Sequence, residues 1–134
     1  MQMTYLLDTH VWYWLVESPE KIPVKVRKSL QQKGSVPFGV SSISLWEIAK
    51  LEENRRITFN VPLDFWMHEA LDPEFIRRVD MDERVAIEST RLPEGFHSDP
   101  ADQIIVATAR VHNLTLITAD QKILDYPHVK SLWS

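Results

Sequence analysis

The chain has 134 residues, of which 44% are hydrophobic and 25% charged, with a formal net charge of −4 and no cysteine. This composition is that of an ordinary globular domain, and it excludes disulfides, thiolate zinc sites and cysteine nucleophiles. No apolar run reaches the ~18 residues of a membrane-spanning helix, and no signal peptide is recognisable. We therefore expect a cytoplasmic protein of one domain, residues 1–134. The negative net charge argues against a protein that binds duplex DNA mainly through its charge. It does not exclude a nucleic-acid enzyme whose bound metals supply positive charge.

Strand-like and helix-like segments alternate along the chain. Short apolar runs predict strands, and longer segments with apolar residues on one side predict helices. In chain order we expect a strand at 4–7, helices at 11–15 and 23–32, a strand at 38–41, helices at 42–53 and 62–71, a strand at 75–79, helices at 82–92 and 100–112, a strand at 114–118, a helix at 121–124 and a last edge strand at 129–133. Residues 57–61 alternate and predict a short edge strand or hairpin arm, and Thr9 and Asp82 are the expected N-caps of the helices after them. This alternation predicts an α/β fold with a parallel sheet.

Acidic residues recur where a predicted strand gives way to a helix. They are Asp8, Glu47, Asp102 and Asp120, with Asp99 as an extra acid beside Asp102. Because the carboxyl ends of parallel strands share one edge of the sheet, and ligands bind there, we expect these acids to meet in one pocket. Carboxylates so close together would repel one another unless a divalent cation held them, and oxygen ligands suit Mg²⁺ or Mn²⁺.

Each of these acids also has a structural interpretation, and for Asp8, at the edge of the sheet, helix capping is one of the possible uses. Ser44 and Glu47 fit a capping box, Asp99 fits a helix N-cap, and Asp102 would lie in that helix's first turn, where the dipole favours negative charge. Asp120 fits the N-cap of the helix that follows it. Capping predicts nothing about convergence, whereas metal binding requires it; both interpretations stay open at this point.

Four motifs follow one another along the chain: LLDTHV at 6–11, SLWEI at 44–48, DPADQIIVATA at 99–109 and LITAD at 116–120. In this order and spacing they resemble the PIN domain and, more closely, the VapC toxins of bacterial type II toxin–antitoxin (VapBC) modules. The resemblance covers nearly the whole chain. It implies a single PIN domain over residues 1–134, a three-layer α/β/α sandwich with a central parallel sheet of four to five strands.

The resemblance also implies a function. VapC toxins are Mg²⁺- or Mn²⁺-dependent endoribonucleases, usually homodimers, which hydrolyse RNA and are neutralised by a cognate VapB-type antitoxin. Carried over by position, the catalytic and metal-binding acids are Asp8, Glu47, Asp102 and Asp120, with Asp99 as a further candidate metal ligand. Contacts to substrate or to these ligands are assigned to Thr9, His10 and Gln103, the last standing where the family commonly has arginine.

Other residues near the motifs have two interpretations each. The aromatic run at 12–14 would stack RNA bases or pack in the core or against a partner. Trp46 and Trp66 are expected in the core or in partner contacts. Lys50 would contact phosphates or simply lie in solvent at the end of its helix.

Two other functions remain as alternatives. A non-catalytic PIN-like interaction domain would use the acids only as caps. A receiver-like, Mg²⁺-binding phosphoacceptor domain is less favoured, because it needs an acidic pair after the first strand and this chain has the single acid Asp8 there.

Overall fold

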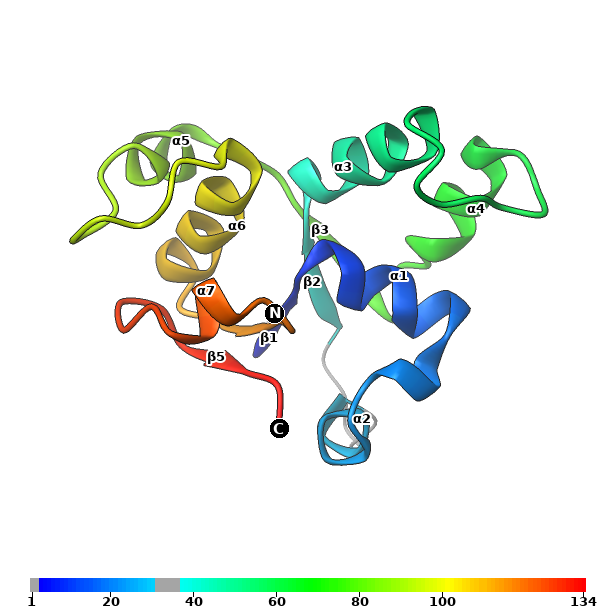
Figure 1. The fold of residues 1–134 in the computed structure, drawn as a ribbon, viewed down its shortest axis with the longest axis horizontal. Helices are drawn as coiled ribbons and strands as arrows, with labels where there is room; N and C mark the ends of the chain where they lie inside the picture. The colour runs from blue at the N-terminus through cyan, green and yellow to red at the C-terminus, as the bar shows by residue number, and fades with distance from the viewer. Residues whose placement is uncertain (1–2, 31–36) are drawn as a thin grey trace.

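The computed structural model describes residues 3–30 and 37–134. Within these residues, five strands form one parallel sheet in the order β3-β2-β1-β4-β5 (Figure 1). The strands are β1 (Tyr5–Leu7), β2 (Phe38–Ser41), β3 (Ile76–Val79), β4 (Thr115–Ile117) and β5 (Ser131–Leu132). Since β1 pairs with both β2 and β4, the first strand occupies the centre of the sheet, and the residues after it enter the middle of the carboxyl-terminal edge.

Helices cover both faces of the sheet (Figure 1). They are α1 (Thr9–Glu17), α2 (Val24–Leu30), α3 (Ser42–Glu53), α4 (Leu63–Ala70), α5 (Glu83–Ser89), α6 (Pro100–Val111) and α7 (Gln121–Leu124), with a 3-10 turn at Pro19–Lys21. Successive residues of a strand point to opposite faces. Accordingly, Leu7 joins a buried cluster with Trp12 of α1, while Leu6 joins a second cluster with Ile105 of α6. The two clusters, one on each face, confirm the predicted three-layer α/β/α sandwich.

The predicted strand or hairpin arm at 57–61 is wrong. These residues form an irregular segment between α3 and α4, and the ring of Phe59 packs on Trp66 at a centroid distance of 4.6 Å and on Tyr13 at 5.8 Å. The alternating pattern therefore reflects apolar side chains that turn towards the core cluster, which Ile57 also joins.

Some helix starts differ from the prediction. The N-cap of α1 is Asp8, not Thr9: the Asp8 side chain accepts a hydrogen bond from the backbone N–H of Thr9, which is already the first helical residue. Asp82 caps α5 as expected, accepting from the N–H of Val85 at 3.0 Å. The last two residues of the predicted helix 23–32 lie outside the described residues.

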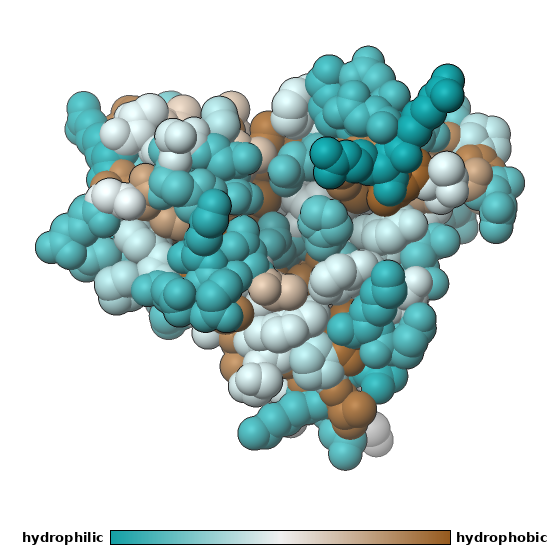
Figure 2. Space-filling view, in the orientation of Figure 1, coloured by the Kyte–Doolittle hydropathy of each residue, from teal (hydrophilic) through white to brown (hydrophobic). Residues whose placement is uncertain are grey.

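The surface in the orientation of Figure 1 is mostly hydrophilic, with apolar side chains visible in separated patches (Figure 2). Among the helices that the structure describes, none combines the length and apolar character needed to cross a membrane.

Candidate functional site

The predicted acids converge on one pocket of about 460 Å³. Its lining consists of Asp8, Thr9, His10, Trp14, Glu47, Asp99, Asp102, Ala119 and Asp120. These residues lie in α1, in α3, at the start of α6 and in the segments that follow β1 and β4, so the pocket lies at the carboxyl-terminal edge of the sheet. The convergence that the strand-to-helix pattern predicted is therefore present.

Asp8 is held by hydrogen bonds from two sides. Its Oδ1 accepts from the backbone N–H of Thr9 at 2.8 Å, and its Oδ2 accepts from the hydroxyl group of Thr118 at 2.6 Å. Burial raises the pKa of Asp8, and the hydrogen bonds from Thr118 and Thr9 lower it in part. Asp8 thus has a fixed orientation and a charge that the protein interior disfavours.

Glu47 is held by the start of α1. The hydroxyl group of the buried Thr9 donates to Glu47 Oε1 and lies 2.8 Å from Ser44 Oγ. Because a hydroxyl group has a single proton to donate, Ser44 is the donor to Thr9 in this arrangement. Burial raises the pKa of Glu47, and the charges of other pocket acids add to the shift.

The capping-box interpretation of Ser44 and Glu47 is wrong. Ser41 caps α3, with its hydroxyl oxygen accepting from the N–H of Ile43 at 3.2 Å. Ser44 already lies inside the helix, with its hydroxyl group in the Thr9 contact. Glu47 is consequently oriented towards the pocket by a side chain from another segment.

Asp99 and Asp120 combine a cap with a place in the pocket. Asp99 Oδ1 accepts from the N–H of Asp102 at 3.0 Å, which caps α6. Asp120 Oδ1 accepts from the N–H of Lys122 at 2.9 Å, which caps α7. The capping interpretation is therefore correct for both residues, and it does not exclude the site, because each carboxylate also lines the acid pocket.

Asp102 has a strongly perturbed acidity. Burial raises its pKa from 3.8 to about 7, and the negative charges of the other acids add to the shift. Those charges belong to Asp8, Asp99, Glu47 and Asp120. All four surrounding carboxylates therefore disfavour the charged form of Asp102.

His97 is a pocket neighbour that the motifs did not single out. Its Nε2 lies 3.3 Å from Asp102 Oδ2, and the ligand atoms of His97, Asp102 and Asp120 all lie within 4.8 Å of one another. Its Nδ1 accepts from the N–H of Asp99 at 3.4 Å, so a neutral ring carries its proton on Nε2, facing Asp102. Gln103 does not line the pocket; its amide donates to the backbone oxygen of His97 at 3.0 Å and steadies that loop.

The sequence does not predict the contacts that three residues make with the acids or with Thr9, namely Ser44 and Thr118, which lie in two of the motifs, and His97, which lies in the loop before Asp99. Thr118 is fully buried and lies directly after β4, two residues before Asp120. A hydroxyl residue at the end of a central parallel strand is the one signal that points to it, because that edge is where ligands bind. For Ser44 the local pattern indicates only a capping box, and no signal points to its contact with Thr9.

The donor set fits a divalent cation. The described lining of the pocket contains five carboxylates and His10, and it contains neither lysine nor arginine. His97 Nε2 is buried and makes no hydrogen bond of good geometry, although it faces Asp102. Hard oxygen donors in this number suit Mg²⁺ or Mn²⁺, whose charge would offset the repulsion that raises the pKa of Asp102.

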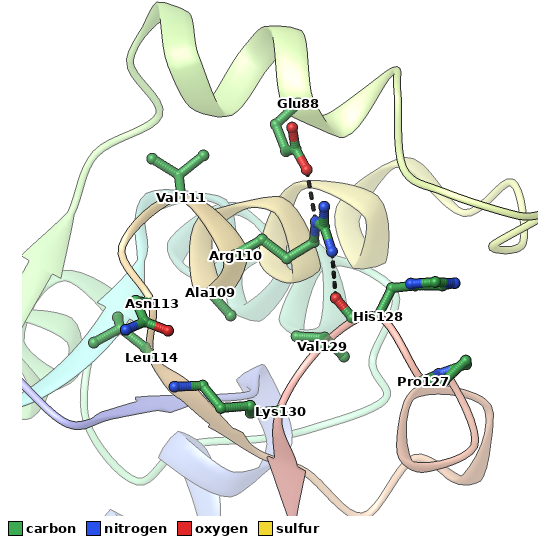
Figure 3. Close-up of a pocket in the computed structure, with 10 residues that line it drawn as sticks. All are labelled: Glu88, Ala109, Arg110, Val111, Asn113, Leu114, Pro127, His128, Val129 and Lys130. Atoms are coloured by element: carbon green, nitrogen blue, oxygen red, sulfur yellow. Dashed lines mark hydrogen bonds and ion pairs between the residues drawn. The ribbon is translucent and has the colours of Figure 1, made fainter.

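A larger cavity of about 590 Å³ lies at the opposite, amino-terminal edge of the sheet, where Leu114 precedes β4 and Lys130 precedes β5 (Figure 3). Figure 3 shows Arg110 between Glu88, to which it pairs at 2.6 Å, and the backbone oxygen of His128, to which it also donates. This arrangement ties α5 and α6 to the segment before β5. It gathers no comparable group of acids, so size alone does not identify the site.

The PIN domain family profile matches residues 5–129. The chain belongs to the PIN-domain family. This PIN domain is 33% identical to Ribonuclease VapC22 of Mycobacterium tuberculosis (strain ATCC 25618 / H37Rv) over 125 residues, or 93% of each chain, which places it with the VapC proteins. Family membership removes the receiver-like alternative.

Solved structures share the fold. The PIN domain is similar to a chain of DNA-bound VapBC from Salmonella typhimurium, with a TM-score of 0.72, 19% identity, and coverage of 99% of this chain and 100% of that one. It is also similar to a chain of VapBC2 from Rickettsia felis bound to a promoter DNA fragment, with a TM-score of 0.71, 17% identity and the same coverage. These likenesses agree with the five-stranded sandwich described above.

Proposed function

We propose that this PIN domain is a metal-dependent endoribonuclease that acts as the toxin of a toxin–antitoxin pair. The observation that carries the proposal is the gathering of five carboxylates from distant segments into one pocket. Support comes from the 33% identity to a protein named as a ribonuclease. Hydrolysis of an RNA phosphodiester bond needs positive charge beside the scissile phosphate, and a carboxylate-held cation supplies it.

Mg²⁺ or Mn²⁺ would be held by Asp8, Asp102 and Asp120, and Glu47 lines the same pocket. Asp102 rather than Asp99 is proposed as the ligand from α6. Asp99 is exposed and has one oxygen committed to the helix cap, whereas the pKa of Asp102 responds to all four other acids. His97, which carries its proton towards Asp102, would orient that carboxylate.

When bound, the cation would offset charge on the scissile phosphate and increase the acidity of a water molecule. Thr9 fixes Glu47 through the hydrogen bond to Oε1, and a carboxylate with a raised pKa is suited to take a proton from the attacking water near neutral pH. Thr118 and the Thr9 N–H fix Asp8 in the same manner. The chain therefore contributes oriented carboxylates, and without the cation the charged forms of Asp8 and Glu47 are disfavoured by burial.

The proposal extends to the protein partner of this chain and to its oligomeric state. Two of the similar structures are named as VapBC complexes, which supports a VapB-type antitoxin as the partner of this chain. We further infer a cytoplasmic homodimer built from a single PIN domain, residues 1–134, with RNA as the substrate.

The first test is cleavage of total RNA by antitoxin-free protein in Mg²⁺ or Mn²⁺, with sequencing of the new 5′ ends. Asp8→Asn is the test variant, and Asp64→Asn is its control, because Asp64 lies on α4 outside the pocket. We expect discrete cleavage by the wild type and Asp64→Asn and none by Asp8→Asn. Equal cleavage by Asp8→Asn in a clean preparation would contradict the mechanism.

A cation titration separates the nuclease from a domain whose acids only cap helices. Binding that is restricted to the folded state raises the melting temperature. We expect Mn²⁺ to raise it for the wild type and not for Asp8→Asn. A melting temperature that is indifferent to Mg²⁺ and Mn²⁺ would favour the non-catalytic interaction domain.

A further inference from the structure

A second pocket of about 440 Å³ adjoins the acid pocket. It is lined by Ile43, Trp46, Glu47, Asp99, Pro100 and Ala101. Glu47 and Asp99 line both pockets, so these two side chains form the boundary between them. The rest of the second lining is apolar, and this space is called the Trp46 pocket below.

Trp46 is the aromatic side chain in this lining, and it is exposed. Trp66 is only 5% exposed and lies in the core, whereas Trp46 is 55% exposed. The helix explains the difference: Ser44 and Ile48, which are four residues apart, are fully buried on one face of α3, and a residue midway between them points to the opposite side. Of the two interpretations of Trp46, this exposure excludes the core, and the partner contact stays a prediction.

We propose that the Trp46 pocket binds an unpaired nucleobase of the RNA beside the scissile phosphate, with the base stacked on Trp46. The proposal rests on the proposed ribonuclease function and adds to it a binding site for one base. A base buried in a duplex has both faces covered, so only an unpaired base can stack on Trp46.

Electrostatics favour this occupant. Without its cation the acid pocket repels the phosphate backbone, and neither lysine nor arginine is among its described lining residues, so attraction that does not depend on charge is favourable next to it. Stacking on an aromatic ring provides such attraction and accepts any base, because every base has a π-face. The apolar walls formed by Ile43 and Pro100 suit the edge of a base in the same way.

A cation lies over the ring of the same tryptophan. Lys50 Nζ is 5.8 Å from the centroid of the Trp46 ring, and its ion pair with Glu53, at 2.7 Å, is exposed to solvent. An exposed pair of this kind contributes little and exchanges readily for another anion. Lys50 is thus placed to meet a backbone phosphate of the nucleotide whose base lies on Trp46.

The test uses a short single-stranded RNA of defined sequence that the wild type cleaves at one bond, and versions with an abasic residue at each position around that bond. The variants are Trp46→Ala, Trp46→Phe and the control Phe65→Ala, since Phe65 is also 55% exposed and lies on α4 away from both pockets. We expect Trp46→Ala to lower kcat/KM by roughly 5- to 150-fold. Trp46→Phe should retain most of the activity and Phe65→Ala all of it.

The abasic substrates give the decisive readout. If one base stacks on Trp46, removing that base slows the wild type, and the difference between the wild type and Trp46→Ala disappears on that substrate alone. An equal loss on every substrate, or no loss, overturns the proposal. A loss that accompanies a change in the molar mass of the protein in solution, measured by light scattering, also overturns it and assigns Trp46 to an interface between copies of the chain.

Binding separates this proposal from failure of the nuclease itself. If the wild type cleaves no RNA, the affinity of a fluorescein-labelled oligouridylate is measured in Mg²⁺ for Asp8→Asn with and without Trp46→Ala. A weaker affinity caused by Trp46→Ala, with Phe65→Ala unchanged, supports a base site in the absence of catalysis. Equal affinities overturn the base site.

Discussion

The hydroxyl group of Thr118 donates a 2.6 Å hydrogen bond to Asp8 Oδ2, across 110 positions of sequence. The same hydroxyl oxygen accepts from the backbone N–H of Asp120 at 3.0 Å. One fully buried side chain therefore links the acid after the central strand to the acid after its neighbour. This link sets the spacing of two proposed cation ligands.

Replacing Thr118 by valine removes that link while keeping the shape of the side chain. Because the hydrogen bond lowers the pKa of Asp8 against burial, its loss raises the pKa further and disfavours the charged ligand. We expect Thr118→Val to weaken Mn²⁺ binding by about 10–100-fold, the usual range for partners of metal ligands. Isothermal titration calorimetry measures the change, and Thr118→Ser, which keeps the hydroxyl group, should bind nearly as the wild type does. Unaltered affinity in Thr118→Val would show that Asp8 needs no such support.

Neutralising Asp102 should stabilise the protein without metal. Its pKa is raised to about 7 by burial and by the charges of four acids. At alkaline pH an amide in its place removes both the cost of burying a charge and the repulsion from those acids. We expect Asp102→Asn to raise the melting temperature in EDTA by ~3–6 °C, equivalent to about 1–2 kcal/mol in a domain of this size. The same variant should lose the rise in melting temperature that Mn²⁺ produces in the wild type. A lower melting temperature in EDTA would mean that the Asp102 carboxylate is stabilising by itself.

The stability of the metal-free protein should fall with rising pH in a defined window. A carboxyl group whose pKa is raised in the folded state contributes stability that is fully present below its unfolded pKa and is lost as pH rises through the folded value. For Asp102 these values are 3.8 and about 7, and the pKa values of Asp8 and Glu47 shift in the same direction. We expect the melting temperature of the wild type in EDTA to fall relative to Asp102→Asn between about pH 4 and pH 7. Saturating Mn²⁺ should remove this relative fall, and a constant difference between the two proteins across that window would contradict the shifted pKa.

The Arg110 cluster should matter for folding and not for cleavage. Arg110 pairs with Glu88 of α5 and donates to the backbone oxygen of His128, with less than a third of either charged side chain exposed. We expect Arg110→Met to lower the free energy of unfolding by about 1–3 kcal/mol, because hydrogen bonds to charged groups are lost and Glu88 is left without its partner. Urea unfolding measures the loss, and a double-mutant cycle with Glu88→Gln isolates the pair. The RNA cleavage rate of the folded variant should match that of the wild type. A marked loss of rate would show that the Arg110 contacts at the amino-terminal edge of the sheet affect the acid pocket at the other edge.

Several features follow from local sequence because their causes are local. Apolar runs, helical periodicity and caps such as Asp82 depend on near neighbours, and they predicted most of the strands and helices. The pocket was predictable for a similar reason. Once a parallel sheet is expected, the residues after its strands lie at one edge, whatever the order of the strands.

The pairing of side chains within that pocket depended on the tertiary structure. The Thr118–Asp8 bond requires β1 and β4 to be neighbours, and the bond from Thr9 to Glu47 requires α1 to meet α3. Residues 57–61 also required the tertiary structure. Their alternation of apolar and polar residues fits an edge strand as well as it fits an irregular segment packed on Trp66. Local pattern determined which residues lie at the edge of the sheet and which segments are helical or extended. Only packing between distant segments decided which hydroxyl groups hold which acids and that Trp46 faces solvent, because those contacts are selected by the fit of the whole core.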